Sequence, residues 1–192
     1  MSKKGGHGVF TKNIEFSLTV SDINRAIREL NNFQQQLHRA MQGLCEEMLE
    51  NGALHAKIEI SRLHAVDTGA LMASIGHGAF DPSSRTGIVY AGGYYAFFVE
   101  FGTGIVGKDN PHPGLSDGTV GKFAVLGANG SVYTGYDTNH HGTEGWWYRP
   151  VGSNKYEWTK GMKARPFMYN TYLYLEDFAK RYGGEIIAEF IV

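Results

Sequence analysis

Glu100 is the side chain whose setting most clearly calls for a chemical partner in this sequence of 192 residues. It lies in the run Tyr94–Phe101, which holds five aromatic residues and is followed by Gly102-Thr103-Gly104. A carboxylate that leaves water costs several kcal/mol unless a cation or hydrogen-bond donors compensate it. We therefore expect one of two arrangements. Either Glu100 forms an ion pair with Arg165, within a subunit or between subunits, or it stays at the surface and caps backbone amides of the glycine turn.

Asp67-Thr68-Gly69 is the triplet that carries the catalytic aspartate of aspartic proteases. Those enzymes need two such carboxylates that share a proton, and this chain contains the triplet once. In the proteases the triplet also follows a strand, whereas here helical patterns flank it on both sides. The sequence therefore favours a structural role, with Asp67 or Thr68 capping a short helix over residues 69–75.

A metal-dependent hydrolase is a second catalytic alternative, because three of the eight histidines lie in one polar region. They are His112, His140 and His141, with Asp137 and Glu144 nearby. Adjacent histidines point apart in a strand, and the sequence has no His-Glu-x-x-His helix. We therefore expect polar loop histidines, no metal, no cofactor and no enzymatic activity.

Five aromatic residues gather late in the chain and suggest a binding surface. They are Trp146, Trp147, Tyr148, Tyr156 and Trp158. One interpretation is a carbohydrate- or cell-wall-binding module that stacks sugars on these rings. The interpretation that we favour is a hairpin whose aromatics pair across strands or pack on a partner, since Tyr and Trp are frequent at interface centres.

The overall charge argues against a protein built around nucleic-acid binding. The net charge is −1 and the isoelectric point is about 6.7. Lys3, Lys4, Lys160 and Lys163 are candidates for weak, non-specific phosphate contact only. No apolar run approaches the ~20 residues of a membrane span, so no membrane contact is predicted. A polar N-terminus without an apolar signal core predicts a protein that stays in the cytoplasm where it is made.

The first third of the chain is predicted to be a strand followed by a long helix. Strict alternation over residues 10–20 is typical of a half-buried strand. Ser21-Asp22 then offers a helix N-cap, and a helical apolar pattern continues to Leu63 with a bend near Gly52. Its apolar stripe exceeds what a small sheet can cover, so part of it is expected to pack on another subunit. The stripe comprises Ile23, Ile27, Leu30, Leu37, Met41, Leu44 and Met48.

The remainder alternates short elements with turns. Strands are predicted over residues 76–80 and 86–90, a short helix over 94–101, and a last helix from Arg165-Pro166 to Gly183-Gly184, followed by a strand over 185–192. Residues 105–161 are predicted to be an aromatic- and glycine-rich insertion with hairpins at Asn129-Gly130 and between 146–148 and 155–159. A loop of this length is unusual without partners, so we expect neighbouring subunits to order it.

Three separated motifs occur in a fixed order. The first extends from Val66 to Ser74, the second from Tyr95 to Gly104, and the third from Arg165 to Met168. Together they resemble the tail-completion, or neck, protein family of long-tailed double-stranded-DNA phages, typified by the tenth gene product of a lambdoid coliphage. The similarity covers roughly residues 20–104 and 160–185. The residues that carry it are Asp67, Thr68, Gly69, Tyr95, Ala96, Glu100, Phe101, Gly102, Thr103, Gly104, Arg165, Pro166 and Phe167.

The resemblance implies a fold and a role. The fold is α+β: a long N-terminal helix and a C-terminal helix packed on a small, mostly antiparallel sheet, as one domain over residues 1–192 with the insertion at 105–161. The role is that of a structural virion protein made in the host bacterial cytoplasm. It forms part of an oligomeric ring, a hexamer or dodecamer, at the head–tail junction, and it contacts neighbouring neck, connector and tail proteins. The family supplies no catalytic residues.

Overall fold

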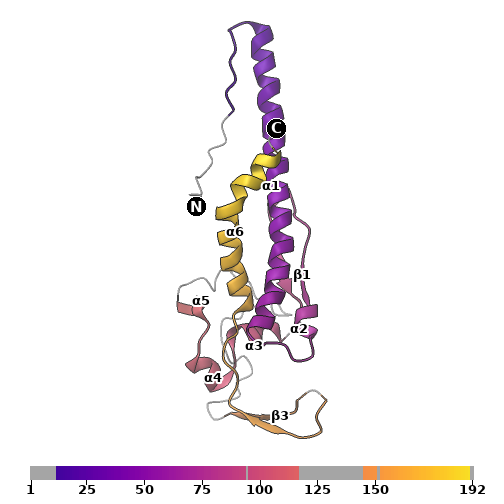
Figure 1. Cartoon of the computed structure of the whole chain (residues 1–192), viewed down its shortest axis with the longest axis vertical. Coiled ribbons are helices and arrows are strands. Elements are labelled where there is room, and N and C mark those ends of the chain that lie inside the picture. Colours follow the sequence, from indigo (N-terminus) through magenta and orange to yellow (C-terminus); the bar gives the residue numbers. More distant parts are fainter. Residues whose placement is uncertain (1–11, 94, 117–144, 151, 191–192) are drawn as a thin grey trace, which may run out of the picture. The chain divides into compact units, whose positions relative to one another are not determined.

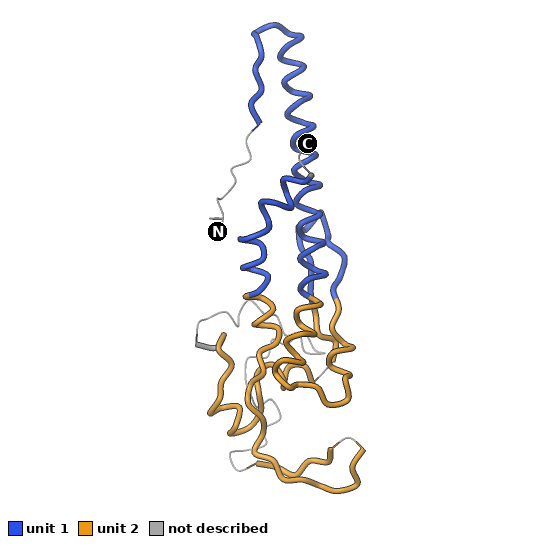
Figure 2. Tube along the Cα trace, in the orientation of Figure 1, with its two compact units in different colours: residues 1–52, 77–89, 174–192 blue, residues 53–76, 90–173 orange. Residues whose placement is uncertain are grey.

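The computed structural model describes residues 12–93, 95–116, 145–150 and 152–190. Figure 1 shows the elements in chain order, and Figure 2 shows the two compact units into which the chain divides. Unit 1 comprises residues 1–52, 77–89 and 174–192, and unit 2 comprises residues 53–76 and 90–173. Two long helices and two small antiparallel sheets confirm the predicted α+β class. The single domain predicted over residues 1–192 stays a prediction.

Helix α1 (Val20–Arg62) is 43 residues long and begins one residue before the predicted cap at Ser21-Asp22. The Thr19 hydroxyl accepts a hydrogen bond from the Asp22 amide at 3.3 Å, so Thr19 caps the helix. The helix continues without interruption through Gly52, where a bend was predicted. A Cβ added at Gly52 would lie 3.0 Å from side-chain atoms of both Leu175 and Val89. Glycine at this position therefore allows close packing within unit 1.

The predicted strand over residues 10–20 is wrong for its described part. Residues 12–16 have no regular structure, and α1 begins at Val20. Phe16 and Leu18 remain exposed. Alternation supplies one apolar face, but a strand also needs a neighbouring strand to pair with its backbone. No described strand pairs with this segment.

Helix α6 (Phe167–Phe190) is 24 residues long and continues through Gly183-Gly184. The predicted stop at these glycines and the predicted strand after them are therefore wrong over residues 185–190. A Cβ added at Gly183 would lie 3.5 Å from a methyl carbon of Leu44 on α1. Packing of α6 against α1 within unit 1 outweighs the low helix propensity of two glycines.

Gly184→Ala tests this continuous helix. Nothing lies within 4 Å of a Cβ added at Gly184, and alanine is favoured over glycine inside a helix by about 1 kcal/mol. We expect the free energy of unfolding in urea to rise by roughly that amount. A neutral or destabilising result would indicate that the chain turns here, as the glycine pair predicts from sequence.

Each unit has its own apolar core. In unit 1, the main buried residues are Ala40, Leu44, Leu49 and Phe178. In unit 2, they are Ala56, Ile60, Leu71, Ile75, Phe97, Val99, Phe101, Phe167 and Tyr169. The core of unit 2 therefore draws on all three sequence motifs.

The first sheet pairs β1 (Ile75–His77) with β2 (Val89–Ala91) close to the predicted positions, but both strands are short. An isolated antiparallel bridge between Asp81 and Thr86 extends the hairpin. Hydrogen bonds from Ser83 and then Ser84 lower the pKa of Asp81 to about 2. Among the described residues, the predicted small sheet is two separate two-stranded sheets.

The beginning of the predicted insertion is helical rather than extended. It contains α4 (Gly104–Asp109) and α5 (Pro113–Ser116). Pro113 is the first residue of α5, a position that suits proline because the missing N–H has no partner there. The hairpin predicted at Asn129-Gly130 lies outside the described residues.

Candidate functional site

Glu100 is buried at the end of α3 (Ala96–Phe101), the short helix predicted from the aromatic spacing. Its residue is only 5% exposed. One carboxylate oxygen, Oε1, accepts hydrogen bonds from His112 Nε2 at 2.9 Å and from the Tyr169 amide at 3.0 Å. The other, Oε2, accepts from the Met168 amide at 2.9 Å. Glu100 therefore caps the N-terminus of α6 from a distant part of the chain, where the helix dipole favours negative charge.

The two expectations for Glu100 both need correction. Its side-chain partner in the described structure is His112, through a hydrogen bond, and no ion pair with Arg165 occurs there. It does cap backbone amides, but those amides belong to α6 and not to the glycine turn, and the carboxylate is buried rather than at the surface. The buried acid does have hydrogen-bond donors, as expected, but they are His112 and the first amides of α6.

His112 is a buried residue that the sequence analysis placed among polar loop histidines. It is 1% exposed, and its Nδ1 accepts a hydrogen bond from the Gly114 amide at 2.9 Å. An acceptor nitrogen carries no proton, so the proton is on Nε2 and points at Glu100. The imidazole also stacks near Phe101 and Tyr169, with ring centroids 4.6 and 5.2 Å away. The prolines on either side of it, which restrict the backbone, are the signal that favours a fixed position.

The Glu100–His112 pair resembles an acid–base dyad in composition but not in accessibility. Both carboxylate oxygens and both ring nitrogens have partners inside unit 2. A general base needs a free lone pair within reach of a substrate proton. This geometry positions helix α6 and offers no open atom for proton transfer.

A second polar cluster joins the end of α1 to the start of α6 within unit 2. Arg62 donates two hydrogen bonds to Glu59, each 2.7 Å long, and Asn170 donates to the same carboxylate at 2.6 Å. These donors, Arg62 first, lower the pKa of Glu59. Glu59 and Glu100 thus hold the first turns of α6 from two sides.

Gly102-Thr103-Gly104 lies against residues 160–164. Thr103 and Met162 exchange backbone hydrogen bonds of 2.9 and 3.2 Å. A Cβ added at Gly102 would lie 2.7 Å from backbone atoms of Ala164 and Met162, and one at Gly104 would lie 2.5 Å from the Lys160 carbonyl oxygen. Both glycines have positive φ, 77° and 60°. The glycines of this motif therefore permit both the backbone conformation and the close approach of the returning chain.

The first motif lies at the start of a short helix, as predicted, but its cap differs from the predicted one. The Thr68 hydroxyl accepts a hydrogen bond from the Ala70 amide at 3.3 Å, just before α2 (Ala70–Ala73). Gly69 has φ of 80°, which favours glycine. The N-cap of α2 is Gly69, without a side-chain cap hydrogen bond, so the prediction that Asp67 or Thr68 is the cap is wrong. Thr68 instead accepts from the first helical residue across a tight turn.

The third motif starts α6, as predicted. The Arg165 amide donates to the Val99 carbonyl at 2.8 Å, and Pro166 precedes the first helical residue, Phe167, which is fully buried. Among the described residues, the Arg165 side chain donates a hydrogen bond from Nη1 to the Met162 sulfur at 3.9 Å. Its buried Nε has no hydrogen-bond partner among the described residues.

The three motifs meet at one cleft of about 830 Å³ within unit 2. Asp67, Thr68 and Gly69 line it from the first motif, and Tyr95, Val99 and Thr103 from the second. Arg165 lines it from the third motif, and Trp146 lines it from the predicted insertion. The lining is mainly apolar, and Arg165 is a cation with unused donors. Such a site suits a peptide segment that carries apolar side chains and an acidic group.

The aromatic residues of the predicted hairpin form β3 (Trp146–Tyr148) and β4 (Glu157–Thr159), paired antiparallel. Trp147 faces Trp158 across the strands, with ring centroids 5.4 Å apart. This confirms the predicted cross-strand pairing. Trp147 is still 62% exposed, and Tyr148, Tyr156 and Trp158 are also exposed. The hairpin therefore presents an aromatic surface to solvent.

The remaining candidates are less informative. Lys160 and Lys163 are exposed, as a weak phosphate contact requires, and Lys3 and Lys4 lie outside the described residues. His140, His141, Asp137 and Glu144 also lie outside them. Within the described ranges, no three His, Cys, Asp or Glu side chains are grouped closely enough to hold a metal ion. The described helices include none that is both long and apolar enough to span a membrane.

Comparison with protein-family models, with curated proteins and with solved structures gave no match to this chain.

Proposed function

We propose that this protein is a structural subunit of the neck of a tailed phage or prophage and that it forms part of a ring at the head–tail junction. The observation that carries the proposal is the convergence of three motifs on one cleft. These motifs are the ones through which the sequence resembles the neck family. Residues far apart in the chain thus contribute to one surface, as a binding role requires.

The internal use of Glu100 and His112 supports a structural role over catalysis. Their polar atoms hold α6 and the segment before α5, and they are buried. The cleft is lined mainly by apolar side chains, and its polar residues include His64, Asp67 and Arg165. This composition supports binding of a chain segment rather than activation of a substrate.

Ring formation needs two different complementary surfaces on each subunit. We propose that the cleft is one surface and that a segment of the adjacent subunit enters it, with an acidic group against Arg165. The exposed aromatic face of the β3–β4 hairpin supplies further contact to a neck, connector or tail protein. Lys160 and Lys163 contribute at most weak, non-specific attraction to DNA.

The test is a mass measurement on the purified protein, alone and after addition of capsids or tails from the phage that encodes it. We expect ring-sized assemblies on one of these particles, visible by electron microscopy. Arg165→Gln should reduce their formation, whereas Arg28→Gln, which removes the same charge from an exposed position on α1, should not. A protein that ignores both particles would overturn the proposal.

A carbohydrate-binding module is the second candidate, favoured by the exposed aromatic surface of the hairpin. Sugar rings stack on such surfaces, so the isolated protein would bind glycan or cell-wall fragments. Binding that is lost in Trp147→Ala but kept in Arg165→Gln would support this candidate over the neck role.

A further inference from the structure

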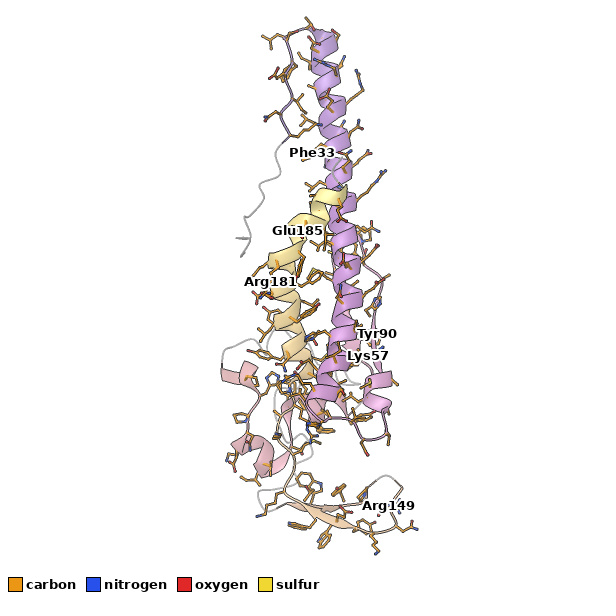
Figure 3. The ribbon with its side chains drawn as sticks, viewed as in Figure 1. Phe33, Lys57, Tyr90, Arg149, Arg181 and Glu185 are labelled. Carbon is orange, nitrogen blue, oxygen red and sulfur yellow. The ribbon has the colours of Figure 1, made fainter. Side chains whose placement is uncertain are left out.

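The first half of α1 carries an apolar stripe most of whose side chains are exposed among the described residues. Ile27 is 50% and Leu30 55% exposed, and Val20, Ile23 and Met41 are exposed too. Further along the same helix, Leu44 is buried in unit 1, next to Gly183 of α6. Figures 1 and 3 show α6 ending beside the middle of α1, with no second described helix beside its N-terminal half. The stripe is therefore open where α6 has ended.

The stripe has the spacing of a coiled-coil seam rather than of an ordinary amphipathic helix. Its residues alternate by three and four positions through four heptads. The a positions are Val20, Ile27, Gln34, Met41 and Met48, and the d positions are Ile23, Leu30, Leu37 and Leu44. A strict a/d repeat of this kind keeps one narrow seam facing a partner helix. A helix that packs on a broad globular core more often shows a wider apolar face.

Charge is absent from the seam and its flanks. Between residues 20 and 45 the charged residues occupy only the outer b, c and f positions; they are Asp22, Arg25, Arg28, Glu29 and Arg39. The e and g positions in this stretch are Asn24, Ala26, Asn31, Phe33, His38, Ala40 and Cys45. Two identical faces can therefore meet without repulsion between like charges.

Gln34 is the one polar residue within the seam, and it favours an identical partner. An amide side chain both donates and accepts hydrogen bonds. When two copies lie parallel and in register, each Gln34 faces the other, and the pair satisfies itself. A single buried amide at an a position is a known way to fix register in such helices, at some cost in stability.

We propose that residues 20–41 of α1 pair with the same segment of a second copy as a parallel, in-register coiled coil. The exposed stripe of each copy is then buried against the same stripe of the other copy. This contact concerns self-association alone, and it stands whether or not the protein serves in a phage neck.

The test uses disulfide cross-linking in a Cys45→Ser background, which removes the one native thiol. Single cysteines are placed at seam positions by Ile27→Cys and Leu30→Cys, and at outer positions by Arg28→Cys and Arg39→Cys. After mild oxidation of the full-length protein, we expect covalent dimers at both seam positions and about tenfold less at the outer ones, because cysteines bridge only when their Cα atoms are within roughly 7 Å. Equal cross-linking at all four positions, or no cross-linking at the two seam positions, would overturn the proposal.

Analytical ultracentrifugation gives an independent readout that needs no cysteine. Ile27→Glu with Leu30→Glu should weaken self-association by about a hundredfold or more, since buried apolar anchors become like charges. Both residues are half-exposed within one chain, so unit 1 should keep its fold. Gln34→Leu should strengthen association, because the seam loses its polar residue. Unchanged association in both variants would place the contact elsewhere.

Discussion

Glu100→Ala should lower the free energy of unfolding by about 3–5 kcal/mol, because each buried donor left without an acceptor costs about 1–3 kcal/mol. The substitution leaves three donors without an acceptor: His112 Nε2 and the amides of Met168 and Tyr169. Glu100→Gln should cost less, about 1–3 kcal/mol, because the amide keeps one acceptor oxygen but turns its NH₂ group toward a donor. Urea unfolding followed by circular dichroism measures both.

Glu176→Gln is the control for these variants. Glu176 lies on α6, is largely exposed and pairs with Lys180 at 3.1 Å, so its loss should change stability by less than about 1 kcal/mol. Hydrogen exchange adds a local readout, because the Met168 and Tyr169 amides should exchange faster in Glu100→Ala than in the control. Protection that is unchanged at both amides would contradict the capping role.

Gly104→Ala should destabilise the protein by about 2–5 kcal/mol through two separate effects. Left-handed backbone costs a residue with a side chain roughly 1–2 kcal/mol, and forcing atoms into a packed region costs about 1–3 kcal/mol more. The added Cβ would lie 2.5 Å from the Lys160 carbonyl oxygen and 2.7 Å from the Trp146 ring. Thr103, next to Gly104, exchanges backbone hydrogen bonds with Met162, which follows β4. A shift at residue 104 should therefore also displace the β3–β4 hairpin.

Gly152→Ala separates the two effects. Gly152 has φ of 78°, yet nothing lies within 4 Å of an added Cβ. This control should therefore show only the backbone cost, about 1–2 kcal/mol. If thermal unfolding shows equal losses for Gly104→Ala and Gly152→Ala, the close approach at residues 160–164 does not restrict Gly104.

Both large predictions concern the same part of unit 2, and they affect the proposed cleft in different ways. Glu100 binds the first amides of α6, which follows Arg165 in the chain. Gly104 allows close packing of its backbone against Lys160 and Trp146. A ring contact at the cleft should therefore be weakened by Glu100→Ala and by Gly104→Ala, even though neither residue lines the cleft.

Local patterns in the sequence predicted several elements correctly. The helical spacing of apolar residues predicted α1 and α3, Arg165-Pro166 predicted the start of α6, and the aromatic clusters predicted the β3–β4 hairpin. These features depend on residues close together in the chain, where side-chain period and turn chemistry act directly. Local patterns gave wrong predictions at Gly183-Gly184 and at residues 12–19. At the glycines, packing against α1 near Leu44 keeps the helix continuous. At residues 12–19, no described strand is present to pair with the predicted one.

The sequence by itself determined that Glu100 needs hydrogen-bond donors, because the cost of desolvating a carboxylate acts on any fold. Only the tertiary structure decided that the donors are His112 and the first amides of α6, and that Arg165 keeps an unpaired Nε beside the cleft. Several donors in the chain could satisfy one carboxylate. Which of them reaches it depends on how α3, α5 and α6 pack, and that packing sums many weak contacts between residues distant in sequence.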